Sequence, residues 1–180
     1  MFVNCSVRGP FLPCFMDTPW HRVFTQRLNN LVAIVGSSIN LLPEESQHSV
    51  EFAKRHSFQP PFTHVQTTAY ALSYSAYQRL SQRRFFQIKQ AVDKNTIVLD
   101  YEILLSQILL DEGFQIASIL PTLEKFSAQV RSSALPNTAC EGDMLCQSAF
   151  YGRTLAPSEC VFIKTNRNLL TQEGLASHTY

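Results

Sequence analysis

Apolar residues follow two different spacings along this chain, and each spacing predicts a different secondary structure. Over residues 20–31, Trp20, Val23, Phe24 and later apolar side chains recur at intervals of three and four, which predicts a helix with one buried face. Residues 32–36 (VAIVG) are apolar without interruption and end in glycine, which is typical of a strand buried on both faces. A helix that leads into a buried strand is typical of an α/β fold.

The rest of the chain continues this succession of helix-like and strand-like segments. The clearest helix is expected over residues 98–112, where apolar positions share one face and Gly113 stands where a helix commonly ends. Residues 43–61 are rich in polar and charged side chains, so we expect an exposed and mobile loop there, with one helical turn as an alternative. Further strands are expected over residues 64–72, 114–120 and 160–164, and a short helix over residues 75–80.

The first residues have the composition of a strand in the core of a sheet. Residues 1–3 (MFV) are apolar and strand-favouring, and they run into a turn at Gly9 and Pro10. A chain that begins in a core strand lacks the strands that should pair beside it. We therefore expect an exposed sheet edge near Asn4, and self-association through that edge.

Composition places the chain among globular proteins and argues against two kinds of partner. The sequence has 180 residues, 45% of them hydrophobic and 16% charged, which supports one buried core. With 15 Lys and Arg against 14 Asp and Glu, the net charge of +1 gives no broad basic field for nucleic acid. No apolar run reaches the roughly 20 residues of a membrane-spanning helix. The first residues carry no secretory signal pattern, so a cytoplasmic location is expected.

Cysteine spacing and the absence of common motifs exclude several other classes. The five cysteines are an odd number and form no CxxC pair, so neither a disulfide framework nor a thiolate zinc site is expected. The chain also lacks GxSxG, HExxH, P-loop and GxGxxG motifs. Their absence argues against the commonest hydrolase, metalloprotease and nucleotide-hydrolase classes.

Several separated segments, taken together, carry a resemblance to a known family. They are residues 2–13 (FVNCSVRGPFLP), 20–24 (WHRVF), 35–39 (VGSSI), 64–67 (HVQT), 100–107 (DYEILLSQ), 150–153 (FYGR) and 157–167 (PSECVFIKTNR). In order and approximate spacing, these segments resemble those of rhamnan-synthesis-type and related uncharacterised glycosyltransferases. The resemblance covers most of residues 2–167.

This resemblance implies a fold and an activity. The implied fold is the A-type glycosyltransferase fold, here an incomplete Rossmann-like mixed sheet with flanking helices. Residues 1–170 would be the C-terminal portion of such a domain, with the nucleotide-binding part upstream of Met1, and residues 171–180 a flexible tail. The implied activity is transfer of a sugar from a nucleotide-sugar donor to a glycan acceptor. The alternative is a noncatalytic remnant that binds a glycan or a protein partner.

The resemblance assigns the donor side of the site to the segment around Asn4. In an A-type fold a strand ends in two acidic residues that bind the divalent metal of the donor, and Asn4 and Ser6 occupy that place here. Neutral side chains are weak ligands for a hard cation, so a divalent metal cofactor is in doubt and no metal ligands are assigned. Arg8 could pair with the donor diphosphate instead. Alternatively, Asn4 and Ser6 only shape the following turn, and Arg8 caps a nearby carbonyl.

The resemblance assigns the catalytic base to a carboxylate in residues 100–107. In an inverting transfer a base takes the proton of the acceptor hydroxyl, and this fold usually supplies it at the start of a helix. Glu102 is the first candidate and Asp100 the second, because the dipole at a helix N-terminus would keep either carboxylate ionised. The alternative is that Asp100 caps the helix and Glu102 merely stabilises its first turn.

Further polar residues are candidates for contacts with the sugars and phosphates. His64 and Gln66 alternate on one face of a predicted strand, which suits hydrogen bonds to the acceptor or the donor sugar. A purely structural His64 is the alternative. Lys164 and Arg167 could reach the donor phosphates if the C-terminal segment folds back over the site, and solvated surface positions are the alternative for both.

Overall fold

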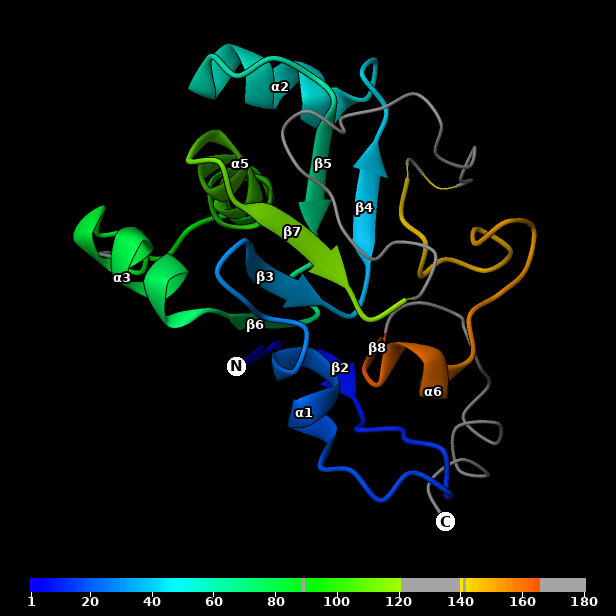
Figure 1. The fold of residues 1–180 in the computed structure, drawn as a ribbon. Helices are drawn as coiled ribbons and strands as arrows, with labels where there is room; N and C mark the ends of the chain where they lie inside the picture. The colour runs from blue at the N-terminus through cyan, green and yellow to red at the C-terminus, as the bar shows by residue number, and fades with distance from the viewer. Residues whose placement is uncertain (89, 121–139, 141, 166–180) are drawn as a thin grey trace.

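The computed structural model describes residues 1–88, 90–120, 140 and 142–165, which form a mixed α/β fold. Its centre is a four-stranded mixed sheet in the order β1-β6-β3-β7 (Figure 1). The pairs β1/β6 and β6/β3 are antiparallel, and β3/β7 is parallel. The strands are β1 (Phe2–Val3), β6 (Ala69–Leu72), β3 (Val32–Gly36) and β7 (Gln115–Ser118).

Strand β3 is buried along its whole length, as its unbroken apolar sequence predicts. Neighbouring residues of a strand point to opposite faces of a sheet. Accordingly, Ile34 packs in one hydrophobic cluster with α3 (Tyr74–Gln82) and α5 (Leu104–Asp111), and Val35 packs in another with α1 (Trp20–Thr25). Helices therefore cover both faces of the sheet, which confirms the expected α/β class (Figure 1).

Two short antiparallel pairs flank this central sheet. Strand β4 (Ile39–Leu42) pairs with β5 (Phe62–Val65), and β2 (Val7–Arg8) pairs with β8 (Ile163–Lys164). A short helix, α6 (Pro157–Cys160), precedes β8. The second pair joins residues near the two ends of the chain, as the figure shows (Figure 1).

The segment expected to be an exposed loop, with at most one helical turn, contains a helix of 10 residues, so that prediction was wrong. Helix α2 (Gln47–His56) begins after Ser46, whose hydroxyl accepts a hydrogen bond from the backbone of Ser49 at 3.2 Å. Most of its polar side chains are at least partly exposed, but Phe52 is fully buried and packs edge-on against Phe62 with ring centroids 4.7 Å apart. A single buried aromatic side chain gives too weak a periodicity to be read from the sequence.

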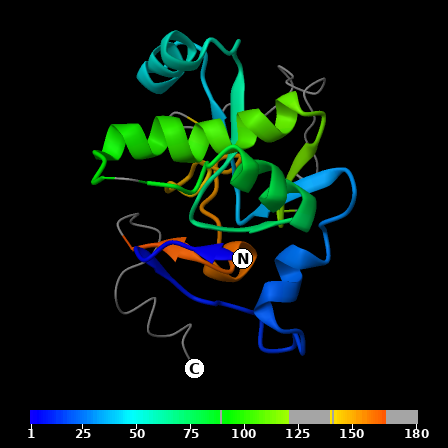
Figure 2. The same cartoon turned by 90° about the vertical axis from the view of Figure 1, so that its left-hand side faces the viewer.

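The clearest predicted helix begins earlier than expected. A continuous helical run comprises α4 (Lys94–Ile97), the π-helical segment η1 (Val98–Ile103) and α5, and it crosses the molecule as one rod (Figure 2). Its N-cap is Asp93, whose carboxylate accepts a hydrogen bond from the backbone of Thr96 at 3.0 Å. The expected strand over residues 114–120 is confirmed as the shorter strand β7.

Helix α1 is shorter than the helix expected over residues 20–31. It ends at Thr25, and Asn29 then accepts hydrogen bonds from the backbone of Leu31 at 2.8 Å and Val32 at 2.9 Å. The spacing of apolar residues continues the helical pattern here, but these hydrogen bonds form a turn instead. Leu31 is therefore exposed.

The first strand is an exposed edge strand and not a buried one. Phe2 is 36% exposed and Val3 is 44% exposed, which corrects the expectation of a core strand. Phe2 is instead held by ring stacking, with Tyr70 at 4.9 Å and Phe86 at 5.6 Å between centroids. Apolar composition alone does not distinguish an edge strand with aromatic contacts from a central strand.

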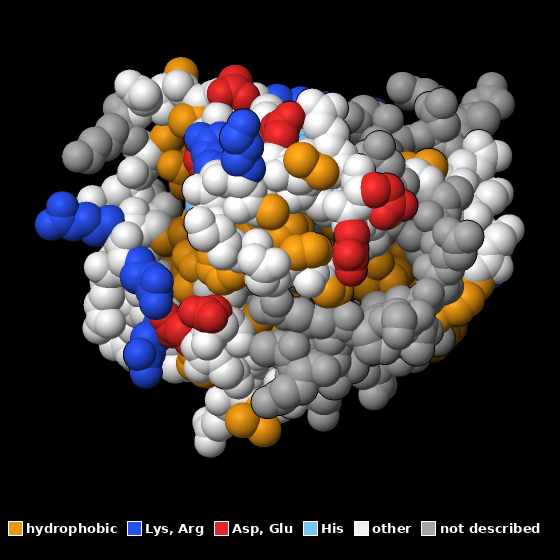
Figure 3. Space-filling view, turned by 90° about the horizontal axis from the view of Figure 1, so that it is seen from above, with side chains coloured by type: hydrophobic (Ala, Val, Ile, Leu, Met, Phe, Trp, Pro, Cys, Tyr) orange, Lys and Arg blue, Asp and Glu red, His pale blue; other side chains and the backbone are white. Residues whose placement is uncertain are grey.

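Charged side chains show no concentration of one sign on the face that carries α2. In the space-filling view of that face, Lys and Arg side chains lie among acidic, neutral and hydrophobic ones (Figure 3). This arrangement agrees with the nearly balanced charge of the sequence. Among the described residues, no helix has the length and apolar character needed to cross a membrane.

Candidate functional site

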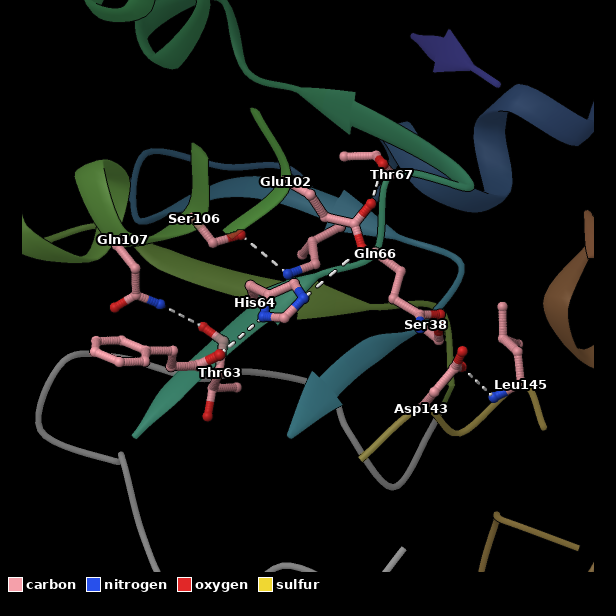
Figure 4. A network of polar contacts seen from close by, with 12 residues as sticks. Ser38, Thr63, His64, Gln66, Thr67, Glu102, Ser106, Gln107, Asp143 and Leu145 are labelled. Atoms are coloured by element: carbon pink, nitrogen blue, oxygen red, sulfur yellow. Dashed lines mark hydrogen bonds and ion pairs between the residues drawn. The ribbon is translucent and has the colours of Figure 1, made fainter. Parts of the chain in front are cut away.

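Strand β5 is held against the helical run by side chains of α5. One edge of β5 pairs with β4, and two polar side chains bind the other edge. Ser106 Oγ accepts a hydrogen bond from the backbone N–H of Val65 at 2.9 Å, and Gln107 Nε2 donates to the carbonyl of Thr63 at 2.8 Å (Figure 4). Both bonds are buried, so they fix the position of His64, which lies between these two strand residues.

Glu102 lies one turn before Ser106 in the same helical run and faces the same strand. Its side chain is 12% exposed. Oε2 accepts a hydrogen bond from the hydroxyl of Thr67, and Oε1 lies 3.8 Å from Nε2 of His64 (Figure 4). Glu102 is therefore a nearly buried carboxylate with partners from the β5–β6 segment.

The backbone determines which nitrogen of His64 faces Glu102. Nδ1 lies 2.8 Å from the carbonyl oxygen of Phe62, and a carbonyl oxygen can only accept a hydrogen bond. Nδ1 must therefore carry a hydrogen, which leaves Nε2 directed toward the carboxylate. When His64 is neutral, Nε2 presents a lone pair and can accept a hydrogen bond, and when His64 is protonated, Nε2 donates one.

The environment of Glu102 keeps its side chain ionised. Burial is the largest influence and raises the pKa of Glu102, but the polar contact and charge of His64, the charge of Lys164 and the hydrogen bond from Thr67 outweigh it. Together they lower the pKa to about 2. The carboxylate is therefore negatively charged at neutral pH.

Glu102 and His64 open onto a cavity, called here the polar cavity, of about 420 Å³. That volume is within the range of small-molecule sites. The residues that line it are Asn40, Leu42, His48, His64, Gln66, Lys94, Asn95, Val98, Glu102, Ile103, Cys140, Asp143 and Lys164. Most of these side chains are polar, so the cavity suits a ligand with many hydrogen-bonding groups.

Two amides in the polar cavity differ in how they are held. Gln66 is almost fully buried, and its Oε1 accepts a hydrogen bond from Ser38 Oγ at 2.6 Å, which fixes the amide plane. Asn40 Oδ1 is buried and has no hydrogen-bond partner in the described part of the chain. A buried acceptor without a partner is costly, so Asn40 is suited to receive a hydrogen bond from a bound ligand.

The structure brings together some of the residues predicted from the sequence and separates others. Glu102, His64 and Gln66 all line the polar cavity. Asp100 instead contacts two side chains of α2. It lies 2.9 Å from Arg55 Nη2 and 2.8 Å from His56 Nε2. It lies outside the polar cavity because residues two apart on a helix point in different directions.

The expected position of these carboxylates at a helix N-terminus was wrong. The helical run begins at Lys94, so Asp100 and Glu102 lie in its middle, within η1. The helix dipole acts mainly on the first turn and does not account for the ionised state of Glu102. Nearby side chains account for it instead. A π-helical segment widens the helix locally, a feature frequent at functional sites.

The predicted donor-binding residues do not line the polar cavity. Asn4 Oδ1 accepts hydrogen bonds from the backbone N–H and the hydroxyl of Ser6, both at 3.0 Å. Arg8 lies exposed on β2, opposite Ile163 of β8. Lys164, the next residue of β8, does line the cavity, whereas Arg167 lies outside the described residues.

Asn4 and Ser6 do not fit the divalent metal that the resemblance associates with this position. The oxygen of Asn4 is already used within the turn, and neither residue brings a negative charge. Across the residues that the structure describes, no group of three or more His, Cys, Asp or Glu side chains is placed to hold a metal ion.

Sequence reasoning missed several residues of the cavity. Asn40 and His48 come from β4 and α2, Lys94 begins the helical run, and Asp143 belongs to a segment with no clear periodicity. Thr67 was part of a recognised segment but had no assigned role, although its hydroxyl binds Glu102. Only the tertiary fold places these residues together.

Comparisons with known proteins identify no family for this chain. No protein-family model matches the chain, no curated protein matches it, and no solved structure matches it.

Proposed function

We propose that this chain is a glycosyltransferase of the A-type, Rossmann-like fold that transfers a sugar from a nucleotide-sugar donor to a hydroxyl of a glycan acceptor. The observation that carries the proposal is the ionised, nearly buried carboxylate of Glu102 in a cavity of mostly polar side chains. Glu102 also belongs to the segment DYEILLSQ, on which the resemblance to glycosyltransferases depends. A sugar presents many hydroxyl groups, and such a lining can pair them.

In this proposal Glu102 is the base. As the acceptor oxygen forms a bond with C1 of the donor sugar, its proton passes to a carboxylate oxygen of Glu102. The bond between C1 and the phosphate oxygen breaks, and its electron pair leaves with the nucleoside diphosphate. Oε1 is the better placed oxygen, because Oε2 already accepts the hydrogen bond from Thr67.

The leaving diphosphate is negatively charged and needs cationic partners. Lys94, Lys164 and His48 line the polar cavity and provide positive or ionisable groups there. Ammonium groups can balance phosphate charge as point charges. Arg8 remains the predicted donor contact outside the cavity, on the strand that pairs with β8.

A second candidate function is glycan binding without catalysis, and the pKa of Glu102 favours it. A general base is most effective when its pKa lies near the working pH, whereas the pKa of Glu102 is about 2. Such a carboxylate is a weak base but a strong hydrogen-bond acceptor for sugar hydroxyls. Glycan binding needs a strong hydrogen-bond acceptor and does not need a general base.

An assay of donor hydrolysis and transfer over a panel of nucleotide-sugars tests the proposal. For the proposed enzyme, Glu102→Gln should lower kcat by roughly 10²- to 10⁴-fold, the usual effect of removing a base, and should leave donor affinity nearly unchanged. Asp100→Asn is the matched control, because Asp100 lies two residues away and outside the cavity. It should keep near-normal turnover.

Other results would decide against catalysis. If no donor of the panel is consumed, and calorimetry shows a glycan that binds the unchanged chain but not Glu102→Gln, the binding function holds and the transferase proposal fails. If Glu102→Gln retains more than about a tenth of the original turnover, Glu102 is not the base.

A further inference from the structure

A second cavity lies beyond Thr67 and differs from the polar cavity in chemistry. This aromatic cavity has a volume of about 320 Å³. Its walls are mainly apolar and include Phe2, Tyr70, Phe85, Phe86, Ile97 and Tyr101. Asn4 and Thr67 are its polar lining residues, and Tyr70 and Tyr101 each carry one hydroxyl. It is therefore an apolar site with few polar groups, the usual composition of a small-molecule pocket.

Ring contacts between the residues of this cavity fix its walls. Phe2 is stacked between Tyr70 and Phe86, with an angle of 11° between the ring planes in both pairs. On the other side, Phe85 meets Tyr101 edge to face, with centroids 5.6 Å apart. Such contacts between aromatic rings add to the stability of the walls beyond their burial. A cavity of this size with aromatic walls suits a planar apolar group.

Thr67 connects the aromatic cavity to Glu102 and determines which ligand group it can bind. Its hydroxyl hydrogen is donated to Oε2 of Glu102. A hydroxyl has one hydrogen, so Oγ1 can only accept a further hydrogen bond. The negative carboxylate behind Thr67 strengthens it as an acceptor, because chains of hydrogen bonds polarise one another. The matching ligand group is a neutral donor such as a hydroxyl.

The small number of polar groups excludes a bare sugar as the best occupant. A sugar ring carries several hydroxyls, and most of them would be buried without partners against phenyl rings. A single hydroxyl on an aromatic ring would place its donor on Thr67 and its ring between apolar walls. Such a molecule therefore matches the cavity in its hydroxyl donor and in its apolar ring.

We propose that the aromatic cavity binds a hydroxyl-bearing aromatic ring, that is, a phenol or a closely similar molecule, with the hydroxyl donated to Oγ1 of Thr67. The site does not depend on the proposed sugar transfer. Its occupant lies on the other side of Thr67 from the polar cavity, so both cavities can be filled together.

The test uses 4-fluorophenol and fluorobenzene, observed by fluorine NMR. 4-Fluorophenol should bind saturably, with a dissociation constant in the roughly millimolar range expected for so small a ligand. Fluorobenzene lacks the donor and should bind about five- to tenfold more weakly, as expected from the loss of one hydrogen bond. Thr67→Val keeps the side-chain shape and should lower the affinity for 4-fluorophenol to that of fluorobenzene.

A cavity-filling variant locates the binding. Ile97 lines the aromatic cavity and is 44% exposed, so Ile97→Trp should fold and should abolish binding of both probes. Val50→Trp is the matched control, because Val50 is a 58% exposed aliphatic residue on α2 outside the cavity. Ile88→Trp, also at an exposed lining position, replaces Ile97→Trp if thermal unfolding shows that the latter does not fold.

Three results would overturn the inference. They are non-saturable binding of 4-fluorophenol, equal affinity for the two probes, and unchanged binding to the cavity-filling variants. Because the readout is binding and not turnover, a chain without transferase activity could still confirm this site.

Discussion

Nε2 of His64 lies 3.8 Å from Oε1 of Glu102, although the two residues are 38 positions apart and belong to different elements. The pair forms because Ser106 and Gln107 bind the free edge of β5. The same helix face that completes the hydrogen bonding of the strand thus sets the carboxylate opposite the imidazole. Stability and the proposed chemistry therefore depend on the same contacts.

The ionisation of Glu102 should make stability depend on pH in a defined window. Its folded-state pKa of about 2 lies below its ordinary value of 4.5, so the native state favours the charged form. The resulting stability is fully present above about pH 4.5 and is lost as the pH falls toward 2. Each pKa unit corresponds to about 1.4 kcal/mol, so the total should be a few kcal/mol.

Urea unfolding of the original chain and of Glu102→Gln at pH 6 and pH 3 measures this effect. Gln does not titrate, so the stability difference between the two proteins should shrink at the lower pH. A difference that stays constant between the two pH values would show that the pKa of Glu102 is not lowered by folding.

Removal of His64 should destabilise the fold because it leaves a buried charge with fewer partners. His64→Leu removes the bond to the carbonyl of Phe62 and the imidazole opposite Glu102. Since Thr67 and Lys164 still stabilise the carboxylate, we expect a loss of roughly 2–3 kcal/mol when His64 is protonated, below the full cost of an unpaired buried ion.

A double-mutant cycle separates this electrostatic effect from lost packing. The variant with both His64→Leu and Glu102→Leu should be more stable than the sum of the two single losses predicts. Strict additivity of the two losses would contradict a direct interaction between the side chains.

Asp100 should behave as a surface ion-pair residue. It joins the helical run to α2 through Arg55 and His56, and the Arg55 side chain is 42% exposed. Exposed pairs contribute little, so Asp100→Ala should cost no more than about 1 kcal/mol in thermal unfolding. Arg55→Ala should cost a similar amount, and a far larger loss from either would show that this contact is a principal support of α2.

Much of the fold follows from local sequence patterns, and the exceptions have physical causes. The unbroken apolar run of β3 predicts its burial because a strand covered on both faces needs apolar residues throughout. The apolar pattern does not predict helix α2, because only a narrow part of its surface, around Phe52, is buried. The early start of the helical run depends on Asp93, a capping residue in a polar segment.

The candidate site was less predictable than the fold. The strand period correctly placed His64 and Gln66 together, since residues two apart share a face. The expected position of Asp100 at a helix N-terminus was wrong because the helix starts six residues before it, at Lys94. Asn40 and Asp143 reach the cavity only through long-range packing, which a single sequence does not encode in any local spacing.

The exposed edge strand should promote self-association, as the sequence also predicts. Strand β1 leaves apolar side chains exposed at the edge of the sheet. Sedimentation velocity should show association that increases with concentration, and Val3→Lys should weaken it. Val50→Lys, at an exposed valine on α2, should leave it unchanged. A chain that stays monomeric at high concentration would contradict this prediction.

Gly142 supports the wall of the polar cavity next to Asn40. Its carbonyl accepts a hydrogen bond from the backbone of Leu41 at 3.3 Å, and its φ is +82°. A Cβ at this position would collide with the carbonyl of Leu41 and would lie 2.7 Å from Oδ1 of Asn40. Gly142→Ala should therefore suffer both left-handed backbone strain and a steric clash.

Gly152→Ala is a control that isolates the clash. Gly152 has a nearly identical φ of +80°, but a Cβ there would meet nothing within 4 Å. Its substitution should cost about 1–2 kcal/mol from backbone strain alone. Gly142→Ala should cost roughly 1–3 kcal/mol more, because backbone atoms must shift to relieve the overlap. Equal losses in urea unfolding would show that Gly142 and Leu41 are not in close contact, and the cavity wall at Asn40 would then need another support.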